Sequence, residues 1–277
     1  MNILFIGDIV GRPGREAVRK GLRGIVERHH VDFVIANAEN AAAGFGITKD
    51  IGDTLLEMGI DVMTSGNHIW DKKEALDYIA AEPRLLRPAN YPVGVPGRGS
   101  TVALSGDGRA VGVVNIMGRV FMTSIDDPFA VVLREIDAIR HKTRIIIVDF
   151  HAEATSEKIA MGWHLDGKVT LVVGTHTHVQ TADERILPQG TAYLTDAGMT
   201  GPHDSIIGME REPSLSRFLT GLPIKFEPAT GNPRLNGIVV TADEKTGRAT
   251  GVTRISYSEQ ELANFARTAE HLSVHQR

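Results

Sequence analysis

The side chains of this sequence that could hold a metal ion fall at the ends of apolar, strand-like runs. Five such runs each end in carboxylate, amide or imidazole groups, and the residues are Asp8, Glu39, Asn40, Asn67, His68, His151, His176 and His178. Because the carboxyl ends of parallel strands lie at one edge of a sheet, we expect these side chains to converge. Oxygen and nitrogen donors without sulfur suit manganese, iron, zinc or cobalt.

The same residue types fit a centre with two metal ions. Two cations held close together repel each other, so a shared carboxylate is needed between them, and Glu39 is the natural bridge. His176 and His178 are two positions apart and point the same way if the chain is extended there, so each could serve one metal.

Each candidate also has an ordinary structural explanation. An acid after a strand, such as Asp8, is often a helix N-cap, and Asn67 with His68 could belong to a turn. His151 taken alone is better explained as a hydrogen-bonded core histidine. The histidines of Gly174-Thr-His176-Thr-His178 are harder to explain in this way. The prediction of a metal centre therefore depends on the whole constellation.

The elements that must position these residues alternate between strand and helix patterns. We expect strands at Ile3–Ile6, Val31–Ile35, Ile60–Met63, Val111–Ile116, Arg144–Val148, Val169–Val173, Thr191–Leu194, Gly237–Thr241 and Gly251–Tyr257. We expect helices at Arg15–Arg28, Ile51–Met58, Lys72–Ala81, Pro128–Ile139 and Ser258–His271. This rhythm predicts a largely parallel, helix-covered sheet, and an α/β fold with more than one sheet layer. No domain boundary is visible, so residues 1–277 are predicted to form a single domain.

Composition excludes several classes of protein. The chain has 277 residues, 23% of them charged, and a net charge of -4, which does not provide the broad basic surface of a general nucleic-acid binder. It has no cysteine, so disulfides, thiolate metal sites and a cysteine nucleophile are excluded. Neither a secretory leader nor a membrane-spanning run is present, and a cytoplasmic location is expected. Binding to nucleic acid and the oligomeric state, including a homo-oligomer, stay open.

These motifs resemble the signature of the calcineurin-like metallophosphoesterase superfamily. The matching segments are Gly7-Asp8, Gly66-Asn67-His68, His151 and Gly174-Thr-His176-Thr-His178. The first motif lacks the usual histidine, and Glu39 stands where the second motif has its bridging aspartate. These departures resemble the bacterial YmdB-like branch, which also has segments similar to Arg87-Pro-Ala-Asn-Tyr-Pro92 and Thr195-Asp-Ala-Gly-Met-Thr-Gly-Pro-His-Asp-Ser205.

The resemblance implies a four-layer α/β/β/α sandwich and a metal-dependent phosphoric diester hydrolase. One metal ion would be held by Asp8, Glu39, Asn40 and His178, and the other by Glu39, Asn67, His151 and His176. The metals would be two divalent or mixed-valence ions, with iron or manganese expected, and the substrate a small phosphodiester, in particular a 2′,3′-cyclic nucleotide. A metal-bridging hydroxide would attack the phosphorus, and His68 would donate a proton to the leaving alkoxide.

Other functions and roles stay open at this point. A phosphomonoesterase or nucleotidase could use the same site, and a metal-binding regulatory protein could lack activity. Gly7-x-x-x-Gly11-x-x-Gly14 weakly resembles a dinucleotide-binding loop but lacks its tight spacing. Among the neighbours of the motifs, Asp149 or Glu153 could orient an imidazole. His203 and Asp204 could face substrate or form a turn, and Phe45 is better explained as a core aromatic than as a base-stacking residue.

Overall fold

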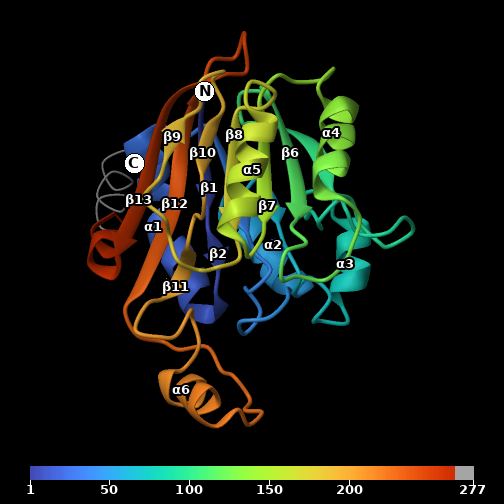
Figure 1. Cartoon of the computed structure of the whole chain (residues 1–277). Coiled ribbons are helices and arrows are strands. Elements are labelled where there is room, and N and C mark those ends of the chain that lie inside the picture. The colour runs from blue at the N-terminus through green and yellow to red at the C-terminus, as the bar shows by residue number, and fades with distance from the viewer. Residues whose placement is uncertain (266–277) are drawn as a thin grey trace.

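Two β-sheets stack face to face in the computed structural model, which describes residues 1–265 (Figure 1). In the first sheet the strand order is β2-β11-β12-β1-β3-β4, and β13 pairs with β12. Its strands are β1 (Asn2–Ile6), β2 (Asp8–Ile9), β3 (Phe33–Asn37), β4 (Val62–Thr64), β11 (Met199–Pro202), β12 (Pro233–Ala242) and β13 (Ala249–Ser258). The second sheet has the order β5-β6-β7-β8-β10-β9, with β5 (Ser100–Leu104), β6 (Ala110–Met117), β7 (Ile146–His151), β8 (Leu171–Thr175), β9 (Arg185–Ile186) and β10 (Ala192–Leu194).

Helices cover the outer face of each sheet, which produces the expected four layers (Figure 1). The first sheet carries α1 (Gly11–His29), α2 (Lys49–Glu57) and α3 (Ala75–Ala81), and the second carries α4 (Pro128–Ile139) and α5 (Thr155–Leu165). A further helix, α6 (Arg211–Thr220), projects from one end of the sandwich (Figure 1). None of the helices in residues 1–265 has the length and apolar character needed to span a membrane.

Side-chain alternation along the strands builds the three hydrophobic layers. In β1, Leu4 and Ile6 pack against the helices, whereas Ile3 and Phe5 face the second sheet, as a period of two requires. Because all of these side chains are fully buried, neither face of the first sheet can move to solvent without exposing apolar surface. The strand register, and with it the position of every strand end, is therefore tightly fixed.

Local sequence signals mark several helix ends. The side chain of Thr48 accepts a hydrogen bond from the backbone N–H of Ile51 and caps α2. Asp127 caps α4 in the same way, and Pro128 fits the first turn, where no N–H is needed. At the other end of α1, His30 takes a left-handed conformation with φ 49°, which stops the helix.

The predicted four-layer α/β class is confirmed, but the expectation of a largely parallel sheet is wrong. Both sheets mix parallel and antiparallel pairs. The hairpin-like turn that the sequence predicts at residues 243–247 is confirmed, and it sends β13 back antiparallel along β12. Two elements near the predicted site, α5 and β11, were not predicted from the sequence. The buried face of α5 includes Glu157 and Lys158, which hides its apolar spacing, and β11 contains Gly201 and Pro202. The final predicted helix begins at residue 259, and its part beyond residue 265, including His271, lies outside the described residues.

Glycines near the N-terminus allow one backbone segment to cross between the sheets. Residues 195–198 connect β10 in the second sheet to β11 in the first. A Cβ atom on Gly7 would lie 1.9 Å from the carbonyl oxygen of Gly198, and one on Gly14 would lie 2.3 Å from that of Thr200. These glycines therefore serve chain packing, which accounts for the spacing that resembled a dinucleotide-binding loop.

We predict that Gly7→Ala destabilises the protein strongly. The added methyl group would overlap backbone that cannot rotate away, so the free energy of unfolding should fall by about 3 kcal/mol. Gly106→Ala is the matched control, because a Cβ atom there meets open space and its φ is not left-handed. Urea denaturation of the two variants measures the difference, and equal stability of both would contradict the packing role of Gly7.

Candidate active site

The predicted site residues converge at the carboxyl ends of strands from both sheets. In Figure 1 the strands β6 and β7 run downward, and the site lies at this lower end. Asp8 opens β2 directly after β1, the pair Glu39 and Asn40 follows β3, and Asn67 and His68 follow β4. From the second sheet, His151 is the last residue of β7, and His176 and His178 follow β8. The residues were expected at one sheet edge, whereas they lie at the stacked edges of two sheets.

Three atoms with lone pairs lie within hydrogen-bond distance of Nε2 of His151. Its Nε2 lies 3.0 Å from Oδ1 of Asn67, 3.1 Å from Oε1 of Glu39 and 3.1 Å from Nδ1 of His176. A single proton on Nε2 cannot serve three acceptors well. Glu39, His151 and His176 each offer one ligand atom, all within 4.8 Å of one another. A cation fits this donor set better than a proton does.

Electrostatics couples Glu39 to His151. Burial alone raises the pKa of the Glu39 carboxyl, but the charges and hydrogen bonds of His151 and, after it, His68 lower that pKa to about 2. For His151, burial lowers the pKa, and the charge of Glu39 reverses this and raises it to about 9. His176 is different, because burial and the positive charge of His151 lower its pKa to about 3. In the metal-free protein, His151 thus carries the positive charge that the buried Glu39 requires.

A second group of donors surrounds Asp8. Its Oδ1 is fully buried, has no hydrogen-bond partner within the described residues, and lies 3.8 Å from Nε2 of His178. Asn40 contributes an amide nitrogen 3.1 Å from the same Nε2 and 3.4 Å from Oε1 of Glu39. Burial raises the pKa of Asp8. A buried carboxylate oxygen without a donor is costly, and it suits an atom that binds a cation.

Neighbouring groups fix which nitrogen of each imidazole faces the cluster. Nδ1 of His151 lies 2.9 Å from the hydroxyl of Thr175, which donates to the buried carboxylate of Asp149 at 2.7 Å. Nε2 of His176 lies 3.1 Å from the carboxylate of Glu153, so its Nδ1 is the nitrogen turned inward. Asp149 acts through Thr175 and Glu153 acts directly, so each orients a different histidine.

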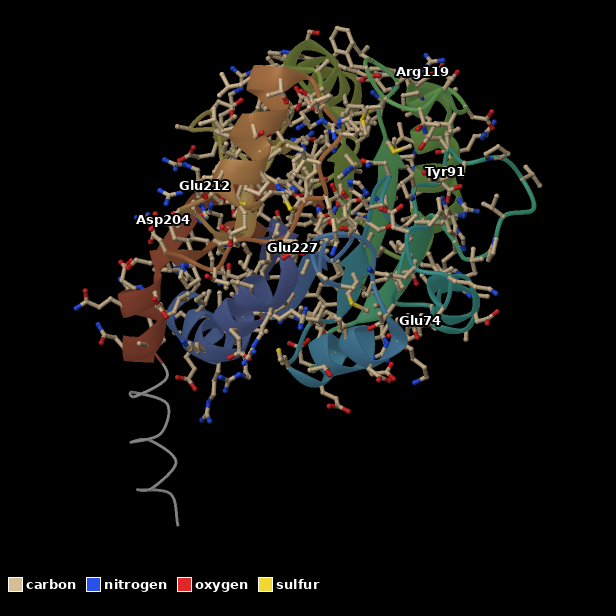
Figure 2. All side chains as sticks on the ribbon, turned by 90° about the horizontal axis from the view of Figure 1, so that it is seen from below. Glu74, Tyr91, Arg119, Asp204, Glu212 and Glu227 are labelled. Atoms are coloured by element: carbon tan, nitrogen blue, oxygen red, sulfur yellow. The ribbon has the colours of Figure 1, made fainter. Side chains whose placement is uncertain are left out.

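A cleft of about 710 Å³ opens beside the two groups. One wall contains Glu39, Asn40, His68, His176 and His178. The other wall belongs to the cap, defined here as residues 203–232, which includes α6 and contributes Arg217, Phe218 and Phe226. The Arg217 guanidinium carbon lies 5.2 Å from the centre of the Phe226 ring. Figure 2 looks onto this end of the molecule, with Glu212 and Glu227 of the cap on one side and Tyr91 and Arg119 on the other.

His68 lies on the cleft wall rather than inside the donor groups. Its backbone N–H donates to Oε2 of Glu39 at 3.0 Å, and its Nδ1 lies 2.8 Å from Oδ2 of Asp71. The ring of Phe45 packs edge to face against the imidazole with centroids 5.0 Å apart, and Phe45 lines the cleft, so its predicted role as a core aromatic is wrong. Asp71 holds Nδ1 and leaves Nε2 as the nitrogen available for proton transfer.

All eight predicted site residues are therefore brought together, whereas two loop residues stay apart from the cleft. His203 uses Nδ1 to contact the carbonyl oxygen of Gly201, and Asp204 accepts a hydrogen bond from Asn232, so both serve turn structure. Asp71 and the cap residues Arg217, Phe218 and Phe226 were not predicted from the sequence. The cap side chains had no detectable signal, because an exposed helix with aromatic residues looks like any surface helix.

Comparisons with known proteins show which proteins the chain resembles. A family profile described as "YmdB-like protein" matches residues 4–255. The chain is 48% identical over 262 residues to the 2′,3′-cyclic-nucleotide 2′-phosphodiesterase of Bacillus subtilis, which covers 95% of this chain and 99% of that protein.

Two solved structures share the fold. The crystal structure of a hypothetical protein from Thermus thermophilus has a TM-score of 0.87 at 43% identity and covers 94% of this chain and 100% of that chain. A crystal structure described as a novel phosphatase from Mycoplasma pneumoniae also has a TM-score of 0.87, at 34% identity and 93% coverage of both chains.

We predict that His151 in the metal-free protein stays protonated at neutral pH and loses its proton near pH 9. Because this pKa lies above the ordinary value of 6.5, the associated stability is fully present below pH 6.5 and is lost as the pH rises through 9. Imidazole NMR in the presence of a chelator measures the titration. His176 is the internal control and should remain neutral from pH 5 upward. A neutral His151 at pH 7 would contradict the coupling to Glu39.

Proposed function

Because the chain belongs to the YmdB-like family of metallophosphoesterases, we propose that it is a metal-dependent phosphodiesterase that hydrolyses 2′,3′-cyclic nucleotides. The observation that carries this proposal is the convergence of lone-pair donors beside the cleft, with Oδ1 of Asp8 buried and unpaired. The donor set supports two cation sites that share Glu39, and the cleft has room for a nucleotide.

The donor groups support the expected division of ligands. One ion would be held by Asp8, Glu39, Asn40 and His178, and the other by Glu39, Asn67, His151 and His176. Asn40 takes part if its amide turns so that the oxygen, rather than the nitrogen, faces His178. Two such ions, with iron or manganese expected, supply positive charge that makes hydroxide accessible and offsets the charge of a phosphoryl group.

The chain's own residues then account for binding and proton transfer. The cleft orients the phosphodiester beside the donor groups, and the aromatic side chains of the cap provide an apolar wall for a nucleobase. His68, oriented through Nδ1 by Asp71, holds a proton at Nε2 for the oxygen that leaves phosphorus. Glu153 keeps the Nε2 hydrogen of His176 engaged away from the cluster.

Hydrolysis of 2′,3′-cyclic AMP, bis-p-nitrophenyl phosphate and p-nitrophenyl phosphate, with Mn²⁺ and with a chelator, tests the proposal. We expect chelator-sensitive turnover of both diesters in preference to the monoester. Preference for the monoester would replace the proposal with a phosphomonoesterase or nucleotidase on the same site. Absence of turnover with any divalent metal would favour a metal-binding regulatory protein.

We predict that His68→Ala lowers kcat for the cyclic nucleotide by about 10²-fold or more, because the leaving oxygen loses its proton donor. The bound metal content should be unchanged, since the His68 side chain lies outside both donor groups. Metal analysis and steady-state kinetics measure the two effects. His164→Ala is the control, because His164 contacts the carbonyl oxygen of Phe129 on the outer helical layer. Loss of metal from His68→Ala would assign this residue a ligand role instead.

We predict that Phe218→Ala raises KM for the cyclic nucleotide about tenfold with little change in kcat, because one stacking surface for the base is lost. Phe218 is 80% exposed and lines the cleft, so its truncation should not unfold the cap. Leu219→Ala is the matched control, since Leu219 is 76% exposed on the same helix and does not line the cleft. Equal KM values for the two variants would exclude Phe218 from substrate binding.

A further inference from the structure

The loop that carries His176 and His178 has a strained backbone. His176 has φ 99° and His178 has φ 66°, both in the left-handed region that side chains with a Cβ atom disfavour. Non-glycine residues hold such conformations only when surrounding contacts impose them. The two histidines nevertheless aim Nδ1 of His176 and Nε2 of His178 at the two donor groups. Some interaction must therefore hold this loop in place.

A fully buried ion pair lies directly beneath the loop. Lys158 on α5 and Asp196 between β10 and β11 are each 1% exposed, and Nζ of Lys158 lies 2.6 Å from Oδ2 of Asp196. Neither residue lines the cleft. A buried charge pair of this kind is an expensive way to gain stability, since a well-packed apolar pair does as well or better. Its contacts indicate a different use.

Within residues 1–265, the other hydrogen bonds of the two charged groups go to the strained loop or to the crossing segment. Nζ of Lys158 donates to the carbonyl oxygen of Thr175 at 2.8 Å. The carboxylate of Asp196 accepts from the backbone N–H of Thr177 at 3.2 Å and from its hydroxyl at 2.8 Å. Its other oxygen accepts from the N–H of Gly198 at 2.8 Å. The pair thus holds the residue before His176 and the residue between the two histidines.

The backbone around the pair is packed too closely to shift. A Cβ atom on Gly174 would lie 1.8 Å from the carbonyl oxygen of Thr195 and 3.0 Å from Cδ of Lys158. The segment that carries Asp196 therefore lies against the end of β8 on one side and, through Gly198, against Gly7 at the end of β1 on the other. This arrangement gives a role to the segment beginning Thr195-Asp-Ala-Gly-Met, which the proposed function leaves unassigned.

We infer that the Lys158–Asp196 ion pair is a positioning device that holds Thr175–His178 in the strained conformation needed to present His176 and His178 to the metal ions. The inference rests on the proposed metal centre. Lys158 and Asp196 act through the loop and touch neither the ions nor the substrate. Their effect should therefore appear first in metal affinity.

Lys158→Met separates positioning from simple electrostatics. The substitution removes a positive charge near the donor groups and leaves Asp196 charged, so electrostatics alone would make a cation bind more tightly. If the pair positions the loop, the freed Asp196 and Thr175 lose their geometry, and Mn²⁺ should bind at least about tenfold more weakly, as expected when groups that orient ligands are lost. The two mechanisms thus predict opposite signs for one measurement.

The Mn²⁺ affinity is measured by calorimetric titration of the chelator-treated full chain with Mn²⁺ alone. Asp166→Asn is the matched control, because Asp166 is also buried at 5% exposure but accepts from the backbone N–H groups of Gln189 and Thr191, away from the loop. It should lower the thermal stability and leave the Mn²⁺ affinity unchanged. Weaker binding by Lys158→Met than by Asp166→Asn supports the inference, whereas unchanged or tighter binding overturns it.

Thr177→Val keeps the test decisive if Lys158→Met does not fold. This substitution changes no charge and removes the hydroxyl that donates to Asp196 at 2.8 Å and makes longer contacts, of 3.4–3.5 Å, to the backbone of Val179. Mn²⁺ should then bind several-fold more weakly. Wild-type affinity in Thr177→Val would overturn the inference. A wild-type protein that binds no Mn²⁺ or other divalent ion would overturn the proposed metal centre itself. A folded Lys158→Met variant with wild-type affinity would instead overturn only the inference about the ion pair.

Discussion

The burial of carboxyl groups at the strand ends is the constraint on which the rest of the structure depends. Asp8, Glu39 and Asp149 are fully or almost fully buried at one end of the sandwich. Carboxylates out of water need donors or positive charge close by, and His151 satisfies only Glu39 directly. Asp149 is satisfied by hydroxyl and amide donors from Thr64, Thr175 and Asn37. Within residues 1–265, one oxygen of Asp8 has no hydrogen-bond partner, as the proposed cation site would require.

Two stacked sheets solve a geometric problem that one sheet edge leaves open. A single edge presents its strand ends in a row, whereas two stacked edges surround a point from both sides. Asp8, Glu39 and Asn67 come from the first sheet, and the three histidines come from the second. The crossing segment at residues 195–198 ties the two edges together where glycines permit backbone contact. The inter-sheet core fixes the register, so the ends cannot slide apart.

The convergence of the candidate donor residues could be predicted from the sequence because donor type and strand end are local features. Each candidate needs only an apolar run followed by a polar side chain, and all eight predicted residues lie at the site. The same reasoning failed for groups whose role depends on tertiary contacts. Lys158 received no prediction, because the helix that carries it was not recognised in the sequence, and it is 1% exposed. Phe45 was expected in the core, and only the position of the His68 loop brings it to the cleft wall.

The cap is largely exposed, whereas the donor groups at the strand ends are buried. This difference bears on how one centre could serve different phosphate esters. Of the helix α6, only Ser214 is buried, whereas Leu215, Phe218 and Leu219 are each more than half exposed. The donor groups are instead fixed by two sheets, an ion pair and close backbone packing. Residues on the cap can therefore change without disturbing the buried donor groups. Chemistry would then be set by the rigid end of the sandwich, and the choice of substrate by the exposed helix that faces it.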